Sequence, residues 1–151
     1  MENLDSEKSL DKLSNPNRPA TIDDYKEFAD QTERVVNKVS LMVENITDSV
    51  VRINELSAQV KLECARMEHT LDVLMIKAQR DIKIYEESLP ILDRQFEKCQ
   101  NRMDKLMDKA MDLITSDLSA ESLNRQEAMM SLIEITNNSL NTLIAKLIPS
   151  Y

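Results

Sequence analysis

The side chains that could do chemistry are few and scattered in this 151-residue sequence. His69 is the only histidine, whereas zinc sites and the paired Glu-x-x-His motifs of di-iron proteins normally need more. Cys64 and Cys99 both lie on apolar positions, which is typical of buried free thiols that pack as small hydrophobic groups. No nucleophile, acid/base pair or catalytic triad can be assembled from these residues. We therefore predict no catalytic, cofactor-binding or metal-binding residues, and no enzyme activity.

The complete absence of glycine also excludes several kinds of active site. Phosphate-binding loops, dinucleotide fingerprints and nucleophile elbows all require glycine, because their backbones turn sharply or approach the ligand closely. The sequence thus argues against nucleotide-dependent chemistry.

A regular pattern of methionine and aspartate occupies residues 103–112. A flexible methionine surface for helical ligands is one interpretation, and a carboxylate metal site is another. We prefer a third, in which methionines line a core and aspartates lie on a solvated helix face. The pattern consists of Met103, Asp104, Met107, Asp108, Met111 and Asp112.

Composition predicts an all-α protein, because glycine is absent, aromatics make up only 3 % and helix-forming residues dominate. The net charge is −8, and residues 21–60 hold eight acids but only four bases. Such charge opposes binding to nucleic acid or to an anionic membrane surface. With two cysteines and no export signal or membrane-spanning run at the N-terminal end, we expect a cytoplasmic location.

The elements that would position these residues begin with a predicted helix over about 21–85, longer than any other in the chain. Thr21 and Asp24 form a capping-box pattern at its start. Apolar residues then recur at alternating steps of three and four, as in a coiled-coil seam. The weak helix formers at residues 45–49 leave an alternative open, in which the helix breaks near residue 47. Because no glycine or proline lies there, we favour a continuous helix.

Two shorter helices are predicted over about 88–115, with Pro90 in the first turn, and over about 120–148. Gln126 and Asn137 fall on the last seam, where they either fix register or face solvent. Residues 1–20 are predicted to be a disordered polar leader, followed by a single helical domain over 21–149.

Unequal helix lengths carry the functional prediction. If the two shorter helices cover only the second half of the long one, part of its apolar stripe stays exposed. We expect that stripe to mediate self-association, giving a helical scaffold or assembly protein that is most simply a homodimer. If the long helix breaks, a closed four-helix bundle results, and a small acidic regulator or inhibitor of one protein partner is the alternative. The predicted interface residues are Val35, Val39, Met42, Ile46, Val50 and Ile53.

Overall fold

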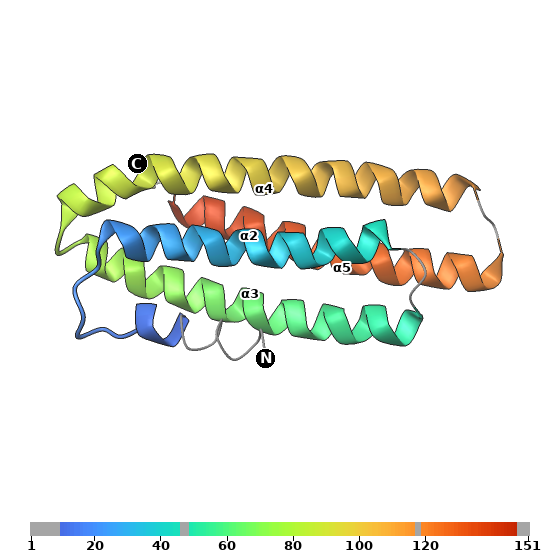
Figure 1. Ribbon diagram of the computed structural model, residues 1–151, viewed down its shortest axis with the longest axis horizontal. Coiled ribbons are helices and arrows are strands. Elements are labelled where there is room, and N and C mark those ends of the chain that lie inside the picture. Colours follow the sequence, from blue (N-terminus) through green and yellow to red (C-terminus); the bar gives the residue numbers. More distant parts are fainter. Residues whose placement is uncertain (1–9, 46–48, 117–118, 148–151) are drawn as a thin grey trace.

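The computed structural model describes residues 10–45, 49–116 (backbone only from 113 to 116) and 119–147. The described residues form helices and no strands, so the predicted all-α class is confirmed. Four long helices lie side by side along one axis (Figure 1): α2 (Ile22–Glu44), α3 (Val50–Ala78), α4 (Ile82–Ser116) and α5 (Ala120–Leu147). Helix α2 packs mainly on α4, and α3 mainly on α5.

The start of α2 follows the predicted capping box. The Thr21 hydroxyl accepts a hydrogen bond from the Asp24 amide at 3.3 Å, and the Asp24 carboxylate accepts one from the Thr21 amide at 3.0 Å. Both interactions satisfy amides that would otherwise have no partner at the helix end.

The predicted continuous helix over 21–85 is wrong. Helix α2 ends at Glu44, Asn45 has non-helical backbone angles, and α3 begins at Val50 with Ser49 as its N-cap. The Ser49 hydroxyl accepts a hydrogen bond from the Arg52 amide at 3.4 Å. Asn45 thus ends α2 and Ser49 starts α3 without glycine or proline. The break lets α2 and α3 lie beside each other (Figure 1).

The second predicted break is also misplaced. Helix α3 ends at Ala78 and α4 begins at Ile82, so the turn comes before residues 85–89 and Pro90 lies inside α4. The Asp81 carboxylate caps the new start by accepting a hydrogen bond from the Ile84 amide at 3.3 Å. Pro90 is exposed, and so is Glu86. Because proline has no amide hydrogen, the Glu86 carbonyl receives no helical hydrogen bond from residue 90. Water can satisfy that carbonyl. Helix α5 agrees with its predicted range to within a residue.

Residues 10–20 correct the prediction of a disordered leader over 1–20. This N-terminal segment begins with a helical turn that buries Leu10 and Leu13. Ser14 Oγ lies 3.0 Å from Thr70 Oγ1, and Lys77 Nζ donates to the Leu13 carbonyl at 3.1 Å. Two leucines three residues apart give one apolar face, enough to hold the segment against α3. Residues 1–9 lie outside the described residues.

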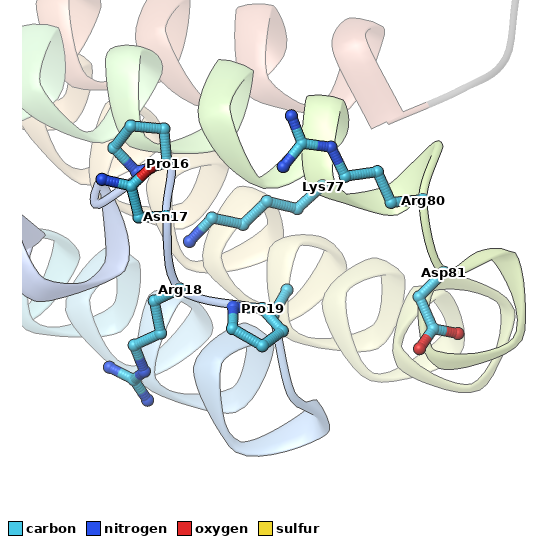
Figure 2. Close-up of a pocket in the computed structure, with 8 residues that line it drawn as sticks. Pro16, Asn17, Arg18, Pro19, Lys77, Arg80 and Asp81 are labelled. Atoms are coloured by element: carbon cyan, nitrogen blue, oxygen red, sulfur yellow. The ribbon is translucent and has the colours of Figure 1, made fainter.

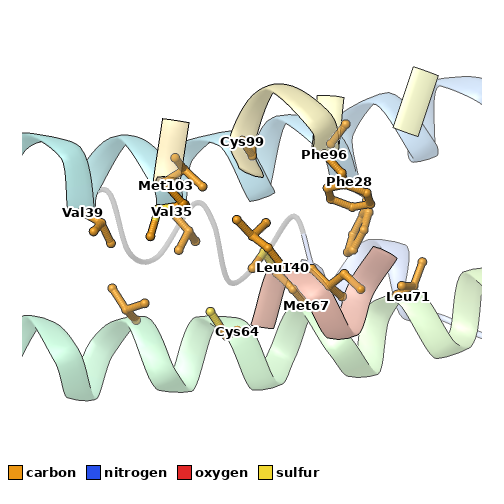
Figure 3. Packing of buried hydrophobic residues seen from close by; sticks show 14 of the residues in the cluster. Phe28, Val35, Val39, Cys64, Met67, Leu71, Phe96, Cys99, Met103 and Leu140 are labelled. Carbon is orange, nitrogen blue, oxygen red and sulfur yellow. The ribbon is translucent and has the colours of Figure 1, made fainter. Parts of the chain in front are cut away.

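A single hydrophobic cluster runs through the N-terminal segment and all four long helices. Within it the Phe28 and Phe96 rings meet edge to face, with centroids 6.0 Å apart. Figure 3 shows the two rings against each other in the core. Tyr25 and Tyr85 direct their hydroxyls to the Leu74 and Leu147 carbonyls, at 3.1 and 3.3 Å. Tyr85 thus satisfies an end carbonyl of α5, whereas Tyr25 adds a second hydrogen bond to a carbonyl in the last turns of α3.

Replacing Phe96 by alanine tests this ring contact. We expect Phe96→Ala to lower the free energy of unfolding by about 3–5 kcal/mol, because it leaves a cavity against Phe28. Ile82→Ala, at a site that is mostly exposed on the same helix, should cost less than about 0.5 kcal/mol. Urea unfolding followed by circular dichroism would measure both. Equal effects would contradict the described core.

Candidate functional site

The residues predicted to form an interface lie largely inside the chain. Val35, Val39 and Ile53 are buried, and Figure 3 shows Val35 and Val39 directed into the core. Met42 and Val50 are half-buried, while Ile46 lies outside the described residues. Helix α2 packs mainly on α4, and the break after Glu44 lets other helices of the same chain cover these side chains. An interface between copies through these side chains would therefore require the helices to separate.

A charge introduced at Val39 distinguishes a position in the core from a position in an interface between copies. We expect Val39→Asp to lower the free energy of unfolding by more than about 3 kcal/mol, because it buries a carboxylate without a partner. Leu41→Asp is the matched control, since Leu41 lies two residues away on α2 and is 58 % exposed. Circular dichroism and urea unfolding would show the difference. Unchanged stability of the Val39→Asp protein would contradict the burial of Val39 and would favour its role in an interface.

The sequence-predicted chemical groups occupy separate parts of the structure. Cys64 and Cys99 are free and buried, as predicted, whereas His69 is exposed on α3. The methionines become more exposed along α4, from the buried Met103 to the exposed Met111. Asp104, Asp108 and Asp112 are all exposed. Within the described ranges, no group of three or more His, Cys, Asp or Glu side chains is placed to hold a metal ion.

Two seam residues of α5 differ in their surroundings. Gln126 is buried, and its amide nitrogen donates to Ser122 Oγ at 3.0 Å. Asn137 is half-buried, and its shielded Oδ1 atom has no hydrogen-bond partner among the described residues. The sequence left open whether these residues lie in the seam or face solvent. Gln126 lies in the core, whereas Asn137 lies at the edge of the core.

Burial changes the chemistry of both thiols. It raises the pKa of Cys99 from 9.0 to about 11, with a smaller contribution from the nearby Glu33 carboxylate. Burial likewise raises the pKa of Cys64, which a hydrogen bond from Ser139 partly offsets. Both thiols therefore stay protonated and poorly nucleophilic at neutral pH.

The raised pKa of Cys99 predicts a loss of stability in alkali. Between pH 9 and pH 11 the thiol ionises in the unfolded chain but stays protonated in the folded one. The free energy of unfolding should consequently fall over this range, by at most about 3 kcal/mol from Cys99 alone. Cys99→Ala should show a shallower fall in urea unfolding at matched pH values. Parallel pH profiles for the two proteins would contradict the assignment.

The surface feature that sequence reasoning missed is a second apolar stripe on the outward side of α3. Val51, Leu62 and Ile76 are 67 %, 54 % and 54 % exposed. Ala58 and Ala65 are exposed between them, and the successive steps of seven, four, three and eleven residues place all five on one face. That face is opposite to the buried Ile53, Val60 and Leu71. The signal was present in the sequence, but the stronger inward seam hid it.

Charged residues border this outward stripe. Lys38 of α2 pairs with Glu63 at 2.7 Å, and Lys146 of α5 pairs with Glu68 and Asp72 at 2.9 and 3.0 Å. The stripe thus runs between ion pairs that join α3 to its neighbours, and the exposed His69 interrupts it between Ala65 and Ile76. Such a rim around apolar residues is typical of protein interaction surfaces.

Comparisons with models of known protein families, with curated proteins and with solved structures find no match to this chain. None of the helices in the described part of the chain combines the length and the apolar composition needed to cross a membrane.

Proposed function

We propose that the chain folds as a closed four-helix bundle and acts as a non-enzymatic helical scaffold or assembly protein, associating through the outward stripe of α3. The observation that carries this proposal is the exposure of Val51, Leu62 and Ile76 on one line. Apolar side chains in a row with heptad-like spacing favour packing against another helix. The proposal keeps coiled-coil association but moves it from α2 to α3.

A second copy of the chain is the partner that the stripe fits. If two α3 helices pack antiparallel about a point between Glu63 and Cys64, Leu62 faces Ala65 of the other copy, and Val51 faces Ile76. Large side chains then meet small ones at the centre, and each contact occurs twice, as two-fold symmetry requires. Exposed alanines let the backbones approach closely.

The same pairing also sets a limit on affinity. Glu55 would face Asp72 of the second copy, and like charges repel. We therefore expect weak, reversible association that strengthens with added salt, which screens the repulsion. A reducing compartment such as the cytoplasm suits the chain, because its two cysteines are free.

Solution mass by light scattering after size exclusion, over a wide concentration range, tests this function. We expect wild type to form dimers as concentration rises, and Leu62→Asp to raise the dissociation constant by about tenfold or more. Leu41→Asp is the control, since it adds the same charge at an equally exposed leucine on α2. Dimers that Leu62→Asp leaves unchanged would contradict the α3 interface.

The alternative function is a small acidic regulator that binds one specific protein as a monomer. The closed core favours it, because Val35, Val39 and Ile53 are already covered within one chain. The net charge of −8 would then select a basic partner. A wild-type protein that stays monomeric at every concentration would favour this alternative over self-association.

A further inference from the structure

A basic cavity lies where the N-terminal segment meets the turn between α3 and α4. It has a volume of about 330 Å³ and is lined on one side by Pro16, Arg18 and Pro19, and on the other by Lys77, Arg80 and Asp81. Figure 2 shows Lys77 reaching from α3 toward Pro16 and Asn17, with Arg18 and Arg80 on opposite sides of it in this view. Three cations around one cavity are unusual in a chain with a net charge of −8.

Several hydrogen-bond donors at this cavity are unused. Lys77 is only 4 % exposed, yet within the described part of the chain its ammonium group donates a single hydrogen bond, to the Leu13 carbonyl at 3.1 Å. Arg18 pairs with Asp24 through Nη2 at 2.9 Å, while its buried Nη1 atom has no acceptor among the described residues. A buried donor without an acceptor costs free energy, which an incoming oxyanion would recover.

The carboxylates near the cavity are already engaged. Asp24 accepts hydrogen bonds from Arg18 and from the Thr21 amide, and Asp81 accepts one from the Ile84 amide. Burial lowers the pKa of Lys77; Asp24 opposes this change, and Arg18 and Arg80 add to it. Two carboxylates thus stand beside three cations, which leaves an excess of one positive charge, a condition that favours an anionic ligand.

We propose that this cavity binds the phosphate group of a small molecule, held between the N-terminal segment and the α3–α4 turn. Two guanidinium groups and an ammonium group together suit a doubly charged tetrahedral oxyanion better than a single carboxylate. The volume is at the small end of the range for ligand pockets, which limits the ligand to a phosphate with few further atoms. Arg80 is exposed, so its side chain can turn toward the ligand. This site is independent of the association proposed for α3.

Titration with inorganic phosphate, followed by two-dimensional amide NMR at constant ionic strength, tests the proposal. We expect saturable shifts confined to the amides of residues 17, 18, 20 and 77–81. Arg80→Gln should weaken binding by about tenfold, the loss expected for one charge-assisted hydrogen bond. Arg94→Gln is the matched control, because it removes the same charge at an exposed position on α4, whereas Arg80 lies in the α3–α4 turn. Lys77→Met should abolish saturable binding while circular dichroism shows a folded protein.

Glycerol 3-phosphate serves as a second probe in the same titration. Binding tighter than that of inorganic phosphate would assign the site to a phosphate ester, and equal binding would assign it to the free ion. Shifts that are spread over the surface, or equal weakening by Arg80→Gln and Arg94→Gln, would overturn the proposal. So would the absence of saturation with both probes. Because Arg80 is exposed, the Arg80→Gln result stands even if Lys77→Met fails to fold.

Discussion

The fold depends on the apolar stripe of α2 being covered by helices of the same chain. Val35 and Val39 could have continued as the seam of one long helix, which would have left them in need of a second molecule. The break between Glu44 and Val50 lets the chain fold back and cover them itself. Hydrophobic burial over a shared core outweighs the few helical hydrogen bonds that the break gives up.

Polar side chains define the helix ends, which hydrophobic burial alone does not fix. Thr21, Ser49 and Asp81 cap the starts of three helices, and the Tyr25 hydroxyl reaches a carbonyl near the end of α3. Each interaction adds little free energy, but each fixes where a helix begins or how its end meets a neighbour. The packing of the helices against one another therefore relies on directional contacts at their ends as well as on the core.

The sequence alone determines the helical class and several boundaries. The absence of glycine indicates helices, the Thr21 and Asp24 pair marks the start of α2, and the predicted range of about 120–148 agrees with α5 to within a residue. The break at residues 45–49 was predicted wrongly as a continuous helix, because the local signals for a cap and for continuity are nearly balanced and long-range burial decides. Pro90 misled for a related reason, since its exposed position in α4 tolerates the lost hydrogen bond.

The candidate surfaces were harder to predict than the fold. Once α2 turns back, the predicted interface becomes core, so the exposed stripe of α3 is identified only after burial is known. The basic cavity joins residues that are far apart in the sequence, Arg18 and Lys77, and no local pattern connects them. Leu10 and Leu13 were overlooked because two leucines in a polar stretch resemble a disordered segment.

The attachment of the N-terminal segment has a consequence for the dynamics of the chain. Leu10, Leu13 and two side-chain hydrogen bonds from α3 hold it, whereas each long helix buries a full apolar face. Because these contacts are few, they can break while the rest of the protein stays folded. Local opening of the segment should therefore cost much less free energy than global unfolding. Amide hydrogens at residues 10–14 should thus exchange with solvent well before those at the centre of α4. The protein then has two levels of cooperativity, a detachable edge and a core that unfolds as one unit.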